Sequence, residues 1–319
     1  MEDKDDTPSL GEVIERLGFG LAHVRVWLFG GGFWLACGSQ LIILGSVGDK
    51  IAEEWSLEPW EKGSLVSVVF VGILTGNAIC GPLGDLCGRR IPILLGYLGI
   101  AVFSVLSALT QSYEALCLVR LLVGVSFGIG QPAVGTLTTE VTPAYWRILM
   151  TSAAQSLFIV GEIYSAALIW HDDPYLVKTD WRWLTVVGAL PAVCFGALAY
   201  FFLLQSPAFL AAQGEYDATK GVLESMRADN QAHGVSVDFR ELPARPSTSS
   251  LALRVVEPIG LIFSRRLFYS TMTVIYSCFT LNCIFYGVIY AVPQVVRKLD
   301  MGQSPAMSIL HGALFELPG

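Results

Sequence analysis

The sequence predicts an all-α protein that crosses a membrane several times. Of its 319 residues, 53% are hydrophobic and only 15% are charged, whereas about a quarter of the residues in a soluble domain are charged. Apolar stretches of roughly 20 residues also recur along the chain. A helix of that length rises about 30 Å and crosses the hydrocarbon core of a bilayer. Both observations predict a polytopic helical membrane protein.

Seven apolar stretches have the length of a membrane span. Their expected boundaries are Val26 to Val47, Ser64 to Leu86, Ile91 to Thr110, Ala115 to Thr139, Leu149 to Trp170, Trp183 to Leu204 and Leu267 to Val292. An eighth stretch begins near Ser304 and is still apolar when the sequence stops at Gly319. The predicted architecture is therefore six spans, a polar connection, and the start of a second group of spans.

The distribution of lysine and arginine predicts a cytoplasmic N-terminus. With this orientation the inner segments hold Lys4, Arg16, Arg25, Arg89, Arg90, Arg147 and the seven basic residues from Lys220 to Arg266. The outer segments hold the smaller set Lys50, Lys62, Lys178, Arg182, Arg297 and Lys298. This asymmetry agrees with the positive-inside rule. The opening MEDKDDTPSLGE lacks the basic and apolar regions of a cleavable signal peptide, so we expect the first span to direct insertion.

The chain divides into four expected parts. Residues 1–24 form a cytosolic segment in which Ser9 and Glu12 have capping-box spacing, which predicts a short amphipathic helix on the inner membrane surface. Residues 25–204 form a six-helix bundle, residues 205–265 a cytosolic loop, and residues 266–319 the seventh span and the start of the eighth. The loop contains a helix-like stretch, Tyr216 to Met226, and the disorder-prone run Pro243 to Ser250.

Several functional classes are excluded by composition and motif. The net charge of -7 and the absence of a clustered basic face argue against nucleic acid as a partner. The seven cysteines have neither disulfide-framework nor zinc spacing. The sequence contains no serine nucleophile with a positioned base, no phosphate-binding glycine loop and no metal-ligand cluster, so neither an enzyme nor a cofactor is expected. The expected partners are the lipid bilayer and a small molecule, and nothing sets an oligomeric state.

A ten-residue motif, GPLGDLCGRR, lies at the inner end of the second span, from Gly81 to Arg90. Its small residues permit close helix packing, and Asp85 precedes a basic turn with which it can form a latch. In the simpler alternative, Arg89 and Arg90 only anchor the membrane face while the glycines pack.

This motif resembles the signature of the major facilitator superfamily of transporters. The matching residues are Gly81, Gly84, Asp85, Gly88, Arg89 and Arg90. The resemblance implies two helix bundles that rock about a central site, with the acidic residue and its arginines holding the cytoplasmic side closed against the second bundle. The segment TEVTPAYWR resembles the same superfamily, and we expect Glu140 and Arg147, separated by Pro143, to form a second inner latch.

Further segments resemble one branch of the superfamily, the synaptic-vesicle-protein-related and organic ion transporters. They are IERLGFG, WSLEPWEKGSLVSVVFVGILTGN, FIVGEIYSA, WRW, QSPAFL and ELPG. In the first span this chain departs from the branch, because Cys37 and Gln40 stand where those relatives commonly carry acids. Gln40 is either a neutral contact for a solute or a tie between two helices.

Two charged residues fall inside predicted spans, where a charge costs at least roughly 2.5 to 3.5 kcal/mol, so both should face protein or a water-filled cavity. Arg120 shares a helical face with Gln131, and Glu162 shares one with Gln155, so both faces are candidates to line a central pathway. Arg120 is expected to hold an anionic group or to pair with an acid. Burial disfavours the carboxylate of Glu162, which makes it a candidate for taking up a coupling proton. The structural alternative pairs Glu162 with Arg120 or with another helix.

Weaker candidates are the amides and tyrosines of the spans, which often only join helices. They are Asn77, Asn282, Tyr286 and Tyr290.

The expected function is secondary active or facilitative transport of a small organic solute by alternating access. A proton, a sodium ion or the solute's own gradient would drive it, in the plasma membrane or a vesicle membrane. One alternative is a hexose porter, which Gln155, Gly161 and QSPAFL favour. The other is a non-transporting scaffold or receptor, or a non-functional fragment, because the acids of the first span are lost and the chain stops inside a span. If it is a fragment, we expect a second copy of the signature beyond Gly319.

Overall fold

A computed structural model describes residues 7–240, 260–299 and 304–316. Every regular element in these ranges is a helix, which confirms the predicted all-α class. Among the described residues, seven helical segments are long and apolar enough to cross a membrane. The run Pro243 to Ser250 and the side chain of Tyr290 lie outside the described part.

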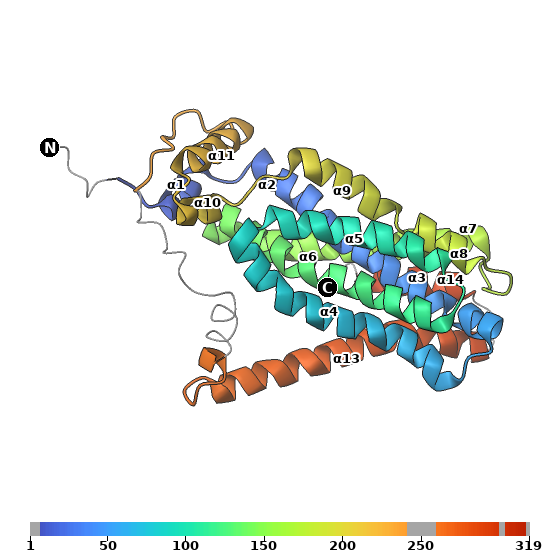
Figure 1. Ribbon diagram of the computed structural model, residues 1–319. Coiled ribbons are helices and arrows are strands. Elements are labelled where there is room, and N and C mark those ends of the chain that lie inside the picture. The colour runs from blue at the N-terminus through green and yellow to red at the C-terminus, as the bar shows by residue number, and fades with distance from the viewer. Residues whose placement is uncertain (1–6, 241–259, 300–303, 317–319) are drawn as a thin grey trace.

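The helices of the first two predicted spans extend at least five residues beyond the apolar stretches at their N-terminal ends, and those of the other four agree with the predicted boundaries to within two residues. They are α2 (Leu21–Arg25) continued through η1 (Val26–Gly30) into α3 (Gly31–Trp55), then α4 (Pro59–Cys87), α5 (Arg90–Leu109), α6 (Tyr113–Val141), α7 (Arg147–Asp172), α8 (Trp181–Val187) and α9 (Leu190–Phe202). Helix α3 lies at the centre of this bundle and packs on α7 and α9, while α6 packs on both α4 and α5 (Figure 1).

Glycines bring α4 and α6 into backbone contact. A Cβ atom added to Gly72 or Gly76 would lie 2.3 Å or 2.2 Å from a carbonyl oxygen of α6. A Cβ atom added to Gly124 or Gly128 would lie 2.1 Å or 2.2 Å from a carbonyl oxygen of α4. Because both helices contribute glycines to the crossing, no larger residue fits without moving a backbone. Small residues serve the same purpose at many crossings between membrane helices.

The sixth predicted span is broken into α8 and α9. Pro191, in the first turn of α9, has no N–H to donate to the carbonyl oxygen of Val187, and the hydroxyl of Tyr164 donates to it instead at 2.8 Å. The hydroxyl of Ser39 donates to the carbonyl oxygen of Gly188 at 2.6 Å. Side chains of α3 and α7 therefore satisfy the carbonyl groups that the break exposes.

The extramembrane helices gather at one end of the bundle, where the GPLGDLCGRR motif also lies (Figure 1). They are α1 (Leu10–Leu17), α10 (Pro207–Gln213) and α11 (Tyr216–Asp229). The capping box of Ser9 and Glu12 is present, as predicted. However, the apolar face of α1 is covered by protein, since Val13 is fully buried in the main core and α1 contacts α11. The prediction that this face lies on the membrane surface is therefore wrong in this structure.

Polar contacts hold α1 and α2 to the rest of that end. The amide of Asn230, just after α11, donates to the carbonyl oxygens of Leu17 and Gly18 and accepts from the N–H of Ala22. The side chain of Arg25 forms an ion pair with Asp229. The turn between α1 and α2 is thus fixed by the helix that follows the sixth span.

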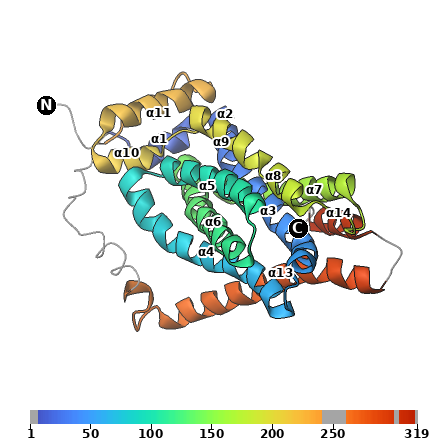
Figure 2. The same cartoon turned by 45° about the vertical axis from the view of Figure 1, so that its right-hand side comes forward.

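The last two described helices lie beside the bundle. Helix α13 (Phe268–Leu299) runs along its length, and α14 (Pro305–Glu316) packs on α7 and α13 (Figures 1 and 2). The ring of Tyr286 on α13 meets the ring of Phe70 on α4 at 4.9 Å between centroids. These two helices close one side of a cavity against α3 and α7.

Candidate functional site

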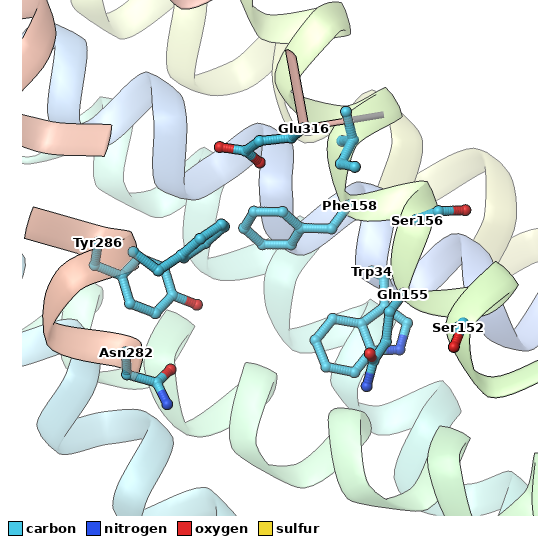
Figure 3. A pocket seen from close by; sticks show the side chains of 10 residues that line it. Trp34, Ser152, Gln155, Ser156, Phe158, Asn282, Tyr286 and Glu316 are labelled. Atoms are coloured by element: carbon cyan, nitrogen blue, oxygen red, sulfur yellow. The ribbon is translucent and has the colours of Figure 1, made fainter. Parts of the chain in front are cut away.

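A cavity of about 630 Å³ lies between α7 and the pair α13 and α14, and α3 forms part of its wall. Its lining residues are Trp34, Ser152, Gln155, Ser156, Phe158, Ile159, Asn282, Phe285, Tyr286 and Glu316 (Figure 3). This volume is in the range of sites for small organic molecules.

The periodicity of two helices explains how the lining is assembled. Residues 152, 155, 156 and 159 of α7 follow a spacing of three or four and therefore share one face. Residues 282, 285 and 286 form the corresponding face of α13. The rings of Phe158 and Phe285 approach each other across the cavity, with centroids 6.3 Å apart. The wall combines aromatic surface with amide, hydroxyl and carboxyl groups, a composition suited to a small organic molecule with polar groups.

Three of the predicted pathway residues meet at this cavity: Gln155, Asn282 and Tyr286 (Figure 3). The amide nitrogen of Asn282 also donates to the carbonyl oxygen of Cys278 in its own helix, at 2.8 Å. Asn77 is not part of the lining and stands on an exposed face of α4.

Arg120 is fully buried rather than exposed to the cavity. Its guanidinium donates to Oε1 of Gln40 at 3.4 Å and to Oγ1 of Thr185 at 3.3 Å. The amide of Gln40 in turn donates to the carbonyl oxygen of Thr185 at 3.2 Å. Gln40 therefore joins α3 to α6 and α8, which favours the helix tie among its two predicted roles. The acid expected beside Arg120 is not among these contacts.

Cys37 and Gln131, two further predicted pathway residues, lie together. The thiol of Cys37 on α3 is fully buried and hydrogen-bonds to the side chain of Gln131 on α6. Neither residue lines the cavity. Their contact joins the same two helices as the contact between Gln40 and Arg120.

Glu162 lies on α7, with only 2% of its surface exposed. Its carboxyl group is hydrogen-bonded to that of Glu316 on α14, and its Oε1 atom has no hydrogen-bond partner in the described part of the chain. The ion pairs found among the described residues do not include Glu162, so the predicted alternative in which it pairs with Arg120 is wrong in this structure.

Arg89 is the centre of a charge cluster where α4 ends, α5 begins and α6 ends. Its guanidinium contacts Asp85 at 3.1 Å and Glu140 at 3.1 Å, and it donates to the carbonyl oxygen of Gly84 at 2.6 Å. These contacts join helices of the first six spans to one another, whereas the signature implied a bridge to the second bundle.

The predicted pair of Glu140 and Arg147 is wrong in this structure. Glu140 binds Arg89, and the guanidinium of Arg147 instead donates to the carbonyl oxygen of Thr142 at 3.0 Å. Pro143 comes between them and begins the single turn η2 (Ala144–Trp146), so the chain changes direction there. After this change of direction, Arg147 binds the backbone of the turn, whereas Glu140 at the end of α6 binds Arg89.

The rest of the signature forms the turn from α4 to α5. Gly88 has a φ of +80° and a ψ of 175°, a conformation that is essentially restricted to glycine. The backbone N–H of Arg90 donates to the side chain of Gln205 at 3.2 Å, and its guanidinium donates to the carbonyl oxygen of Tyr200. Gly81 differs, because a Cβ atom there would meet no described atom within 4 Å. Close packing of this glycine against another helix is therefore not found among the described residues.

Sequence reasoning missed two kinds of site residue. Glu316 lies in the segment ELPG, which was noticed for its resemblance to other transporters, although an acid in an apolar stretch is itself a signal. Trp34, Phe158 and Phe285 were missed because aromatic residues in a span carry no signal that separates a cavity wall from a lipid-facing surface.

Comparison with known proteins identifies related chains. Residues 51–316 match the family model described as "Sugar (and other) transporter". Synaptic vesicle 2-related protein of Xenopus laevis is 28% identical over 72% of this chain and 41% of its own length. Organic cation/carnitine transporter 7 of Arabidopsis thaliana is 29% identical over 72% of this chain and 45% of its own length. Solute carrier family 22 member 15-like of Xenopus tropicalis is 31% identical over 84% of this chain and 51% of its own length. The chain thus spans about half the length of these curated relatives.

Solved structures share the fold. The partially occluded inward-open xylose transporter XylE from E. coli superposes with a TM-score of 0.67 and 18% sequence identity, over 93% of this chain and 71% of that one. XylE bound to 6-bromo-6-deoxy-D-glucose superposes with a TM-score of 0.68 over 92% of this chain and 66% of that one. This likeness establishes the arrangement of the helices.

Proposed function

Because this multi-pass chain belongs to the sugar (and other) transporter family of the major facilitator superfamily, we propose that it carries a small organic solute across a membrane by alternating access. The family is one of transporters rather than enzymes. The observation that carries the proposal is the cavity between α7 and α13. It lies between a helix of the first six spans and a helix that follows the cytosolic connection, as a site between two rocking bundles must.

The cavity supports a solute that has both an apolar body and polar groups. The amides of Gln155 and Asn282 offer donors and acceptors, and the aromatic residues offer flat apolar surface. An organic ion is favoured by the carboxyl group of Glu316 at the cavity wall and by relatives such as the organic cation/carnitine transporter. A hexose is the second candidate, which the family description and the cavity amides favour.

Uptake by proteoliposomes containing the full chain tests the proposal. Labelled hexose, a labelled organic cation and a labelled organic anion are each offered with and without a proton gradient, and again with a sodium gradient. We expect saturable uptake of one of these solutes, reduced at least tenfold by Gln155→Ala. Gln111→Ala, at an exposed position between α5 and α6, is the comparison for general damage. Binding without uptake would instead support the scaffold or receptor alternative.

We also propose that Glu162 takes up the coupling proton. The support for this role is the burial of its carboxyl group beside the cavity. Glu162→Gln removes the titratable group but keeps the size and polarity of the side chain. Uptake by this variant is expected to be independent of pH, whereas uptake by the unchanged chain varies with pH. The same pH profile in both proteins would refute the role.

A further inference from the structure

We propose that Glu162 and Glu316 form a two-carboxyl site that holds one proton between α7 and α14. The inference rests on the proposed function, because it identifies the partner with which Glu162 shares the coupling proton. It also assigns a role to α14, the first described helix after the seventh span.

The geometry of the pair supports this site. Glu162 on α7 has only 2% of its surface exposed. Glu316 on α14 lines the cavity (Figure 3). The two carboxyl groups are hydrogen-bonded to each other. The remaining oxygen of Glu162, Oε1, is buried and has no partner among the described residues. A carboxyl group in this position is unusual, since buried polar atoms normally find a partner.

The chemistry of the contact requires a proton. Two ionised carboxylates have only acceptor oxygens and cannot donate to each other, whereas a protonated carboxyl group donates its O–H to a carboxylate. A hydrogen bond between these two groups therefore needs one carboxylic acid and one carboxylate, which share a single proton. When that proton leaves to water, two carboxylates remain, and their like charges repel each other in a medium of low dielectric constant.

Within the described part of the chain, the groups that interact with the pair carry no positive charge that would replace the proton. Tyr286 on α13, a neutral side chain, is close enough to Glu162 to interact with it. The ion pairs among the described residues include neither glutamate. The cavity beside Glu316 gives a route by which the proton exchanges with water.

The pair thus makes the contact between α7 and α14 depend on protonation. Helix α14 packs on α7. With the proton bound, the hydrogen bond adds to this packing, and without it the two charges oppose the packing. Proton release therefore favours separation of the two helices, which is the kind of movement that alternating access requires.

Infrared spectroscopy of the purified full chain in detergent tests the site without any solute. The unchanged chain is expected to show a carboxylic-acid band at neutral pH that disappears as the pH rises. In Glu316→Gln, Glu162 no longer faces a second carboxyl group, so its band should shift in frequency and its pH dependence should change. Glu114→Gln replaces an exposed glutamate at the outer end of α6 and should leave the band unchanged. The absence of the band at neutral pH in the unchanged chain, or an identical titration in Glu316→Gln, would overturn the proposal.

Hydrogen exchange on the unchanged chain provides a test that needs no variant. We expect the amides of α14 to lose protection as the pH rises. The amides of α5, which is distant from the pair, serve as the reference for the general effect of pH on exchange rates. Equal behaviour of α14 and α5 would contradict the proposal. Neither test measures transport of a solute. A negative result for the carboxyl pair would therefore not contradict the proposed transport function. A proton-sharing pair in a chain that moves no solute would contradict only the transport function.

Discussion

The turn between α4 and α5 depends on Gly88, whose positive φ a side chain rarely tolerates. An added Cβ atom would also lie 2.3 Å from the amide nitrogen of Gln205. This amide is the partner that holds the backbone of Arg90. A glycine in the signature is thus explained by the local backbone and not only by the gating that the resemblance implies.

We expect Gly88→Ala to destabilise the protein by about 1–3 kcal/mol, the usual cost of a strained backbone conformation. Gly81→Ala is the matched control, because that site is helical and open, so its effect should be close to zero or slightly favourable. Thermal unfolding in detergent measures both variants. Equal losses in the two would contradict the backbone explanation.

Asp173 organises the loop between α7 and α8, which the charge distribution predicts to be on the outer side. Burial raises the pKa of its carboxyl group, but the backbone N–H groups of Lys178, Tyr175 and Val177 donate to it and leave the pKa below its usual value. A group with a depressed pKa contributes stability above its unfolded pKa, about 3.9 for an aspartate, and loses that contribution as the pH falls through the folded value.

Protection of the loop amides at residues 175, 177 and 178 is therefore expected at neutral pH and is expected to decline in acid below about pH 3.9. Asp173→Asn should reduce this protection at neutral pH and remove its dependence on pH. Lys178→Ala should have a smaller effect, since the backbone N–H group remains. Hydrogen exchange of the loop is the measurement, and a pH-dependent loss in Asp173→Asn would contradict the assignment.

Buried charges were correctly expected to face protein, and one predicted alternative, in which Glu162 pairs with another helix, agrees with its contact to α14. The sequence did not identify which residues these charges contact. Arg120 contacts the neutral groups of Gln40 and Thr185, and Glu162 meets a second acid. Helical periodicity states which residues share a face, but a neighbour from another helix is set by the packing of the whole bundle. Thr185 illustrates this limit, because nothing in its surroundings along the chain indicates that it binds an arginine.

At the scale of elements, the crossing of α4 and α6 depends on glycines in both helices. Their positions were visible in the sequence, but the sequence did not indicate that the two pairs meet. By contrast, the break in the sixth span had a local signal in Pro191, because proline removes a hydrogen bond from a helix.

Gly124→Ala tests the crossing, because its new methyl group would lie 2.1 Å from the carbonyl oxygen of Val69. A backbone atom cannot yield easily, so we expect a loss of about 1–3 kcal/mol, the range for an overpacked core. Gly135→Ala in the same helix has open space and should be neutral or slightly stabilising. Thermal unfolding and the gel-filtration profile of the two variants decide between them. If Gly124→Ala were as stable as Gly135→Ala, the crossing would not depend on its glycines.

At the scale of the whole molecule, the inner charge cluster ties together the ends of three helices. Arg89 and Glu140 are both largely buried, whereas 60% of the Asp85 side chain is exposed. An exposed ion pair contributes little because solvent screens it. The contact with Glu140 therefore contributes more to the closed inner end than the contact with Asp85 does.

We expect Glu140→Gln to loosen the inner end and to shift the conformational equilibrium by about 1 kcal/mol, which corresponds to roughly a fivefold change in population. Labelling of Cys87, at the inner end of α4, by a membrane-impermeant maleimide measures the shift. Cys117, near the outer end of α6, serves as the internal control. Asp85→Asn should have a smaller effect. A larger effect of Asp85→Asn, or an unchanged rate at Cys87 in Glu140→Gln, would contradict this account.

The sequence by itself determined the helical class, the positions of the spans and the family, because the length and periodicity of apolar stretches and the signature from Gly81 to Arg90 are local properties. Only the tertiary structure decided that Glu140 binds Arg89, that Arg120 contacts Thr185, and that Glu162 meets Glu316 beside a cavity. Those contacts join residues that are distant in the chain. They depend on which helix faces pack together, and the pattern along a single helix does not contain that information.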